Sequence, residues 1–243
     1  MKNTIILSGG AMFLCSGFLR LKLLFVFLLI FVATSWGAFP IKGFGACEFL
    51  AEDFSSAQDW SAYTETGTWT VSGGGLQAEI IGSTSSYASI DFSPTDLFSV
   101  DVDIQVVSAP GVHDRVGTGV FGIGGDVLFS VQGDSREYTT NGILGYYYPK
   151  TNELKFKIWD VLAGEWFVPL AAKTVSGNVD SIGLSMAADG VIFRVNGQDT
   201  DYKLSGDFSL GPFIINKYRL FAGGSTVKVS FDNVCASTYT EST

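Results

Sequence analysis

The strongest hydrophobic pattern in the chain is a two-residue alternation between residues 175 and 196. Apolar residues occupy every second position from 182 to 186 and again from 191 to 195, and Ala188-Asp189-Gly190 separates the two runs. A period of two places alternate side chains on opposite faces of a strand. The Asp-Gly pair, and the Asn-Gly pair at 196–197, supply the positive φ angles that short turns require. The segment therefore predicts a β-hairpin with one buried face.

The same alternation recurs from residue 47 to residue 234, with turn residues between the runs. Besides the hairpin, it predicts strands at 47–53, 68–71, 75–80, 87–92, 98–107, 116–123, 127–131, 142–148, 153–159 and 227–234. No segment of ten residues has the period of an amphipathic helix. The pattern predicts an all-β, two-sheet antiparallel sandwich over residues 47–236. A lead-in at 39–46 precedes this domain, and a disordered polar tail at 237–243 follows it.

Residues 1–38 differ from the rest of the chain and predict a signal peptide. Arg20 and Lys22 precede an apolar run at 23–33, and small residues follow it. Cleavage near residues 35–38 would send the protein to the periplasm, the cell surface or the medium, and Met12 is an alternative start. An uncleaved anchor is disfavoured because the run is too short to span ~30 Å of hydrocarbon. A lipoprotein site at Cys47 is disfavoured by its distance from the apolar run.

The charge of the mature chain limits its partners. The leader removes three of the 15 basic residues, which leaves 12 against 24 acidic residues and a net charge of −12. Such a surface repels phosphate backbones and anionic lipid. We therefore expect no nucleic acid partner, no peripheral membrane binding and no membrane span in the mature chain.

Two cysteines remain after the leader, Cys47 and Cys235, one at each end of the predicted domain. In an exported protein such a pair predicts a disulfide, and two free buried thiols are the alternative. A bridge across so long a loop stabilises by ~4–5 kcal/mol in the chain-entropy account. The chain has no Asn-x-Ser/Thr sequon, which favours a bacterial exported protein.

Several short motifs together resemble the concanavalin A-like lectin/glucanase superfamily, above all its laminin-G-like and family-16-like bacterial branches. They are Glu52-Asp53-Phe54, Trp60, Gly67-Thr68-Trp69-Thr70-Val71, Gly74-Gly75-Leu76 and the closing Phe231-Asp232-Asn233-Val234. The resemblance implies a jelly roll of two antiparallel sheets, with glycan binding or cleavage on a concave face. It also implies one structural Ca²⁺ held by Glu52, Asp53 and Asp232, since hard carboxylates suit that ion. The alternative role of these acids is in capping and turn hydrogen bonds.

Candidate catalytic residues are few. The Glu-x-Asp-x-x-Glu strand of related glucanases is missing, and Asp101-x-Asp103 is the nearest substitute. Two acids on the outer face of one strand are typical of a solvated surface. His113, the single histidine, follows a Pro-Gly turn and is typical of a solvated loop. The Gly-x-Gly-x-x-Gly at 117–122 lies in a β pattern, so it predicts strand curvature or close approach rather than a dinucleotide site.

Aromatic residues outside the predicted core are the more informative candidates. Alternation places Trp159 on the face opposite the core-facing residues of its strand, and at least one tyrosine of 146–148 also lies outside the core. Exposed rings can stack on the apolar faces of sugars, whereas a loop or the second sheet could instead cover them. We therefore predict an exported, non-catalytic carbohydrate-binding module. Its predicted ligand-binding residues are Trp159, Tyr146, Tyr148, Trp166, Asp101 and Asp103. The alternatives are an adhesive surface protein that binds protein partners, and a glycoside hydrolase or lyase without a recognisable motif.

Overall fold

The chain folds as the β-sandwich that the alternation predicts. The computed structural model describes residues 47–55, 59–64, 67–82, 86–122, 128–130, 137–139, 142–160, 165–207 and 215–240. Within these ranges there is no helix, and so none that could cross a membrane. The predicted signal peptide, the lead-in at 39–46 and residues 241–243 lie outside the described residues.

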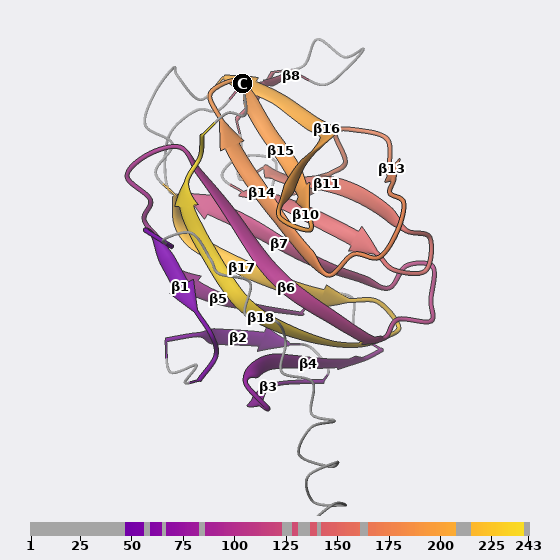
Figure 1. The fold of residues 1–243 in the computed structure, drawn as a ribbon. Helices are drawn as coiled ribbons and strands as arrows, with labels where there is room; N and C mark the ends of the chain where they lie inside the picture. The colour runs from indigo at the N-terminus through magenta and orange to yellow at the C-terminus, as the bar shows by residue number, and fades with distance from the viewer. Residues whose placement is uncertain are drawn as a thin grey trace, which may run out of the picture. The chain divides into compact units, whose positions relative to one another are not determined.

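The hairpin found by alternation lies in the larger sheet. Ten described strands form it, and β14 (Ser181–Ala187) and β15 (Gly190–Val195) are near its middle (Figure 1). On one side of the hairpin, in order across the sheet, lie β3 (Thr68–Ser72), β4 (Gly75–Ile81), β18 (Thr226–Thr238) and β6 (Phe98–Ser108). On the other side lie β16 (Gln198–Asp207), β8 (Leu128–Ser130) and β9 (Glu137–Thr139). The short strand β1 (Leu50–Glu52) pairs with β18.

The second sheet contains eight described strands and lies behind the first in Figure 1. Every described strand pair in both sheets is antiparallel. In order, the strands are β12 (Glu165–Phe167), β11 (Glu153–Asp160), β10 (Gly142–Tyr148), β7 (Arg115–Gly122), β17 (Ile215–Gly223), β5 (Ser86–Asp91) and β2 (Ser61–Thr64), and β13 (Lys173–Thr174) pairs with β11.

The turns of the hairpin region follow the turn residues closely. Asn196 and Gly197 have φ angles of 52° and 74° and form the two-residue connection from β15 to β16. Both angles are positive, as this tight type of turn requires. The other turn begins where predicted but is one residue shorter. Gly190 already pairs with Ala187, so Ala188 and Asp189 alone connect β14 to β15.

The core lies between the sheets and consists of the apolar residues that alternation placed inward. Val100 and Val102 of β6 and Phe156 of β11 are fully buried. Phe156 stacks on Tyr202 with ring centroids 4.9 Å apart, which joins the two sheets. Each large side chain buried in this way stabilises the fold by about 1.5–3 kcal/mol relative to exposure. Trp69 packs at the edge of the core against Phe231, with ring centroids 5.8 Å apart.

Two parts of the sequence prediction need correction. Alternation did not predict six of the described strands, namely β2, β9, β12, β13, β16 and β17, although β17 lies between β7 and β5 in the eight-stranded sheet. The predicted start of the disordered tail, residue 237, is too early, because β18 continues to Thr238. The next residue, Tyr239, donates its backbone N–H to the carbonyl oxygen of Leu97 at 2.9 Å.

The predicted disulfide between Cys47 and Cys235 is confirmed. It links two residues that are 188 positions apart, with Cα atoms 5.2 Å apart. Beside it, β1 pairs with β18 so that Ala51 lies opposite Cys235. The two ends of the folded domain are therefore held together by a covalent bond and by backbone hydrogen bonds.

Candidate functional site

Aromatic and basic side chains gather on the outer face of the eight-stranded sheet, the face turned away from the core. Strand pairing explains this grouping. Trp159 of β11 lies opposite Trp166 of β12, and Gly142 of β10 lies between Trp159 and Phe121 of β7. On the next strand, Arg219 of β17 lies opposite Gly119.

Glycines on β7 and β10 leave room for these side chains to lie flat on the sheet. A Cβ atom at Gly117 would come within 2.7 Å of the Tyr146 ring, and one at Gly142 within 2.5 Å of the Phe121 ring. At Gly119, a Cβ atom would clash with Leu144. The close approach predicted for the glycines at 117–122 therefore comes from side chains of the neighbouring strands.

Two adjoining pockets hollow this face. The smaller has a volume of about 130 Å³ and the larger about 380 Å³. Both are bounded by Tyr87, Phe121, Trp166 and Arg219. The smaller pocket is completed by Arg115, Leu144, Tyr146, Lys157 and Phe221, and the larger by Gly122, Trp159, Asn216 and Lys217. The arrangement combines flat apolar rings with hydrogen-bond donors, as small-ligand sites generally do.

Arg219 lies between two of these rings. Its guanidinium carbon is 4.0 Å from the centroid of Phe121 and 4.5 Å from that of Tyr87. Such cation–π contacts hold a guanidinium in place through its faces and leave the N–H groups in its plane. Burial lowers the pKa of Arg219, and the neighbouring Tyr87 opposes that change.

Tyr146 and Tyr148 lie on the outer face of the eight-stranded sheet, but they are not open stacking surfaces. Only 3% of Tyr146 and 7% of Tyr148 is exposed. Lys155 lies over the Tyr148 ring at 4.5 Å, and Arg115 lies over the Tyr146 ring at 5.5 Å. Burial raises the pKa of both tyrosines. Of the two, only Tyr146 lines a pocket, and neither presents a free ring face to a ligand.

The two outward tryptophans are more accessible. Trp166 is 39% exposed, and Trp159 is partly buried beside it. Their ring centroids are 5.3 Å apart, with an angle of 53° between the planes. Trp166 also meets Phe121 edge to face at 6.1 Å. These two tryptophans are therefore the predicted binding residues that the structure brings together at an open pocket.

Asp101 and Asp103 lie elsewhere. Both are on β6, in the ten-stranded sheet, and alternate there with the buried Val100 and Val102. Their side chains therefore face away from the eight-stranded sheet. The structure does not bring these acids together with the aromatic residues, which corrects the predicted combination.

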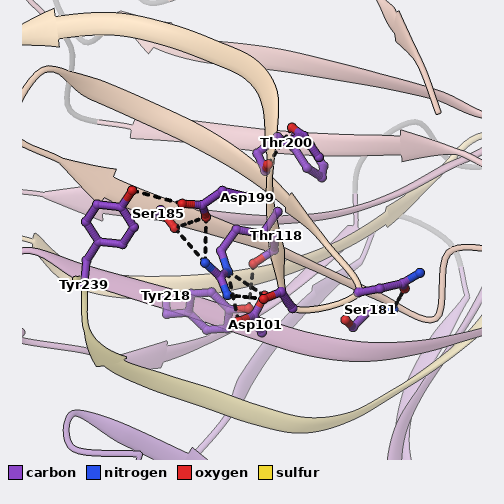
Figure 2. Close-up of polar contacts among 12 residues, drawn as sticks. Asp101, Thr118, Ser181, Ser185, Asp199, Thr200, Tyr218 and Tyr239 are labelled. Carbon is purple, nitrogen blue, oxygen red and sulfur yellow. Dashed lines mark hydrogen bonds and ion pairs between the residues drawn. The ribbon is translucent and has the colours of Figure 1, made fainter. Parts of the chain in front are cut away.

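Asp101 instead belongs to a network on the outer face of the ten-stranded sheet. Both of its carboxylate oxygens accept from Nε of Arg194 at 3.0 Å, and Nη1 of Arg194 donates to Asp199 at 2.6 Å. Asp199 also accepts from Ser185 at 2.7 Å and from Tyr239 at 2.9 Å, and Figure 2 marks both contacts with dashed lines. Burial raises the pKa of Asp101, and the ion pair with Arg194 opposes that rise. Asp103 accepts from the side-chain amide of Asn233 at 3.1 Å.

The acids that the resemblance assigns to Ca²⁺ make local hydrogen bonds. Glu52 accepts from the backbone N–H of Phe54 at 2.7 Å and from Nε1 of Trp60 at 3.2 Å. Asp53 and Asp232 accept from backbone N–H groups of residues 55 and 233. In the described part of the chain, no three His, Cys, Asp or Glu residues converge as ligands of a metal ion. The calcium site stays a prediction, and no chemistry here depends on it.

Ten residues of the pockets were not among the predicted ligand-binding residues: Tyr87, Arg115, Phe121, Gly122, Leu144, Lys157, Asn216, Lys217, Arg219 and Phe221. Phe121 of β7 and Arg219 and Phe221 of β17 face outward, because the apolar residues next to them on these strands face inward. Alternation in 215–223, where Tyr218, Leu220 and Ala222 are buried, was the signal that could have placed Arg219 and Phe221.

No family model matches the sequence, and no curated protein matches it. Several solved structures share its fold. LamAcat from Zobellia galactanivorans aligns with a TM-score of 0.51 and 13% identity, over 77% of this chain and 96% of that chain. A carbohydrate esterase, vb_24B_21, from Shiga toxin-encoding bacteriophage phi24B aligns with a TM-score of 0.50 and 15% identity, over 79% and 98%. The carbohydrate-binding module CBM66 from Bacillus subtilis aligns with a TM-score of 0.48 and 16% identity, over 74% and 96%.

At these identities the comparisons concern the fold alone. They include concanavalin A-like jelly rolls, so the resemblance read from the sequence is confirmed at that level. The aligned region covers nearly all of each of these three structures. A fold of this kind hosts many functions, so function has to be argued from the face itself.

Proposed function

We propose that this protein is an exported, non-catalytic carbohydrate-binding module whose ligand packs on the outer face of the eight-stranded sheet. The pair of adjoining pockets around Trp166 carries the proposal. Sugar rings present apolar C–H faces that pack on aromatic rings, and hydroxyl groups that need hydrogen-bond partners. Trp159, Trp166 and Tyr87 supply rings, and Asn216 and Arg219 supply polar groups.

The fold supports the proposal, because the resemblance to concanavalin A-like proteins implies glycan binding or cleavage on a concave face of the sandwich. The disulfide supports export, since disulfides persist in oxidising compartments. Together these features favour a protein that meets glycans outside the cytoplasm.

Binding is favoured over cleavage by the residues that line the pockets. Retaining glycosidases need two carboxyl groups ~5–5.5 Å apart beside the scissile bond. Among the described residues that line either pocket, none is Asp or Glu. The face therefore offers stacking and hydrogen bonding, and a hydrolytic mechanism has no described pair of acids to begin from.

Affinity electrophoresis tests this function. The mature protein is run through native gels that contain laminarin, xylan, levan, arabinogalactan or polygalacturonate. We expect retardation in at least one gel, and an affinity about 10-fold lower for Trp166→Ala, because the substitution removes the exposed stacking ring.

Tyr239→Ala is the control variant, because Tyr239 is an aromatic residue on the ten-stranded sheet. It should migrate like the wild type in every gel. A protein that no polysaccharide retards would overturn the proposal, and so would equal retardation of wild type and Trp166→Ala. Release of reducing ends during incubation would indicate a hydrolase instead.

A further inference from the structure

The pockets concentrate positive charge in a protein that is acidic as a whole. The chain has 15 Lys and Arg residues against 24 Asp and Glu residues. Four of the basic residues nevertheless line the two pockets: Arg115, Lys157, Lys217 and Arg219. Their local potential is therefore opposite in sign to the net charge of the protein.

Arg219 has unused hydrogen-bonding capacity. Its Nε is buried without a hydrogen-bond partner among the described residues, and its guanidinium makes no ion pair with any described carboxylate. A buried donor left without a partner destabilises the structure. The rings of Tyr87 and Phe121 contact the guanidinium but leave Nε unsatisfied, so Arg219 still has N–H groups to offer. An acceptor that enters the pocket can use them.

Lys157 adds a second cation to the smaller pocket. It lies over the Tyr146 ring at 5.7 Å, and it makes no ion pair with any carboxylate whose side chain the structure describes. Burial lowers the pKa of Lys157, and the positive charges of Arg115 and Lys155 lower it further. Lys217 differs, because Asp91 already pairs with it at 3.1 Å. Like charges held close together are stabilised by a bound anion.

Resting on the proposed function, we propose that the ligand is an acidic glycan. Its carboxylate or sulfate group binds Arg219 and Lys157 in the smaller pocket, while the sugar ring that carries this group packs on Trp166. Arg219 can form a bidentate, charge-assisted contact with either group. The net charge of −9 repels a long polyanion in general, so recognition depends on this local cluster and weakens as salt screens it.

The test compares polymers that differ in charge alone. Polygalacturonate is paired with its fully methyl-esterified form, and dextran sulfate with dextran, so the two pairs separate a carboxylate from a sulfate source. We expect binding to the charged member of at least one pair to be about 10-fold tighter than to its neutral partner. That preference should shrink as the salt concentration rises.

Arg219→Gln should lose about 10-fold in affinity for the charged polymer, and Arg219→Lys should lose less because it keeps the charge. Lys228→Gln is the matched control, since Lys228 pairs with Glu79 on the other sheet and should leave binding unchanged. Circular dichroism and thermal unfolding confirm that each variant is folded.

The outcomes separate the two proposals. Equal binding of neutral and charged partners would overturn the acidic-glycan inference and leave carbohydrate binding intact. Binding of inorganic polyphosphate as tight as that of the charged glycan would overturn the sugar component of the inference. Failure to bind any of these polymers, or any polysaccharide of the affinity-electrophoresis panel, would overturn carbohydrate binding itself.

Discussion

At the scale of single residues, the shape of the outer face depends on positions that lack a side chain. Gly142 lets the Phe121 ring lie against β10, and that ring in turn contacts Arg219 and Trp166. The glycine thus determines where a binding ring lies, although it lines neither pocket.

Gly142→Ala should destabilise the fold by about 1–3 kcal/mol, because the added Cβ would come within 2.5 Å of the Phe121 ring. Only this ring is in the way, so a smaller residue at position 121 should relieve the strain. In urea unfolding, Gly142→Ala combined with Phe121→Leu should cost less than the sum of the two single variants. Strict additivity of the two changes would show that the contact is unimportant.

Asp232 offers a test by pH. Burial raises its pKa, and the negative charges of Asp103 and Asp53 raise it further, while the N–H of Asn233 opposes the rise. The folded state therefore holds this proton more tightly than the unfolded chain. Its contribution to stability is present below the ordinary Asp pKa and is lost as the pH rises through the folded pKa. In EDTA, Asp232→Asn should unfold at a slightly higher temperature than wild type at pH 7, and at the same temperature near pH 3.

The same variant tests the predicted calcium site. If Glu52, Asp53 and Asp232 hold the ion, Ca²⁺ in place of EDTA should raise the unfolding temperature of the wild type and have little effect on Asp232→Asn. If Ca²⁺ leaves the unfolding temperature of the wild type unchanged, these acids bind no calcium and serve only in turn hydrogen bonds.

At the scale of elements, alternation predicts strands well where the inward residues are uniformly apolar. Phe98 to Val107 was predicted as a strand, and β6 covers it with Val100, Val102 and Ile104 buried. The pattern failed at β17, a central strand whose outward residues include Phe221 beside Lys217 and Arg219. An apolar residue that faces outward reduces the difference in polarity between the two faces of a strand, and alternation is recognised by that difference. Such residues occur on this sheet because its outer face also buries aromatic rings.

The candidate site could be predicted only in part for the same reason. Alternation within one strand places Trp159 outward, but it does not say which outward residues of other strands lie beside it. Asp101 and Trp159 are both outward, yet they belong to different sheets. The pairing of strands that are far apart in the sequence determines which residues form the site. Alternation within one strand does not show which other strands pair with it.

The Arg194 network gives a prediction at this scale. Arg194→Met should destabilise the fold by about 3 kcal/mol at pH 7, because it leaves the carboxylate of Asp101 largely buried without its partner. Without Arg194 the pKa of Asp101 should rise further, so the loss should shrink as the pH falls and that carboxyl becomes protonated.

Two variants control this measurement. Lys173→Met breaks an exposed ion pair with Asp201 and should cost less than about 1 kcal/mol. Asp101→Asn combined with Arg194→Met removes one of the two carboxylates that lose Arg194, the other being Asp199, and should recover part of the stability. A loss with Arg194→Met that is independent of pH would contradict the role assigned to Asp101.

At the scale of the whole molecule, the disulfide ties the start of the first described strand to the last. Cys47→Ser combined with Cys235→Ser should lower the free energy of unfolding by ~4–5 kcal/mol, mainly by freeing the unfolded chain. Urea unfolding measures the loss. A reductant should lower the stability of the wild type by a similar amount and leave that of the double variant unchanged. Equal stability with and without the bridge would refute this account.

The most direct test of the binding face uses the indole N–H signals of the mature protein in nuclear magnetic resonance. The protein has four tryptophans outside the predicted signal peptide, and they divide by position. Trp60 and Trp69 donate to Glu52 and Ser86 beside the core, whereas Trp159 and Trp166 line the larger pocket. During titration with neutral and acidic oligosaccharides, the signals of Trp159 and Trp166 should shift and saturate while those of Trp60 and Trp69 stay in place. Saturable binding that leaves the signals of Trp159 and Trp166 unmoved would contradict the proposed site.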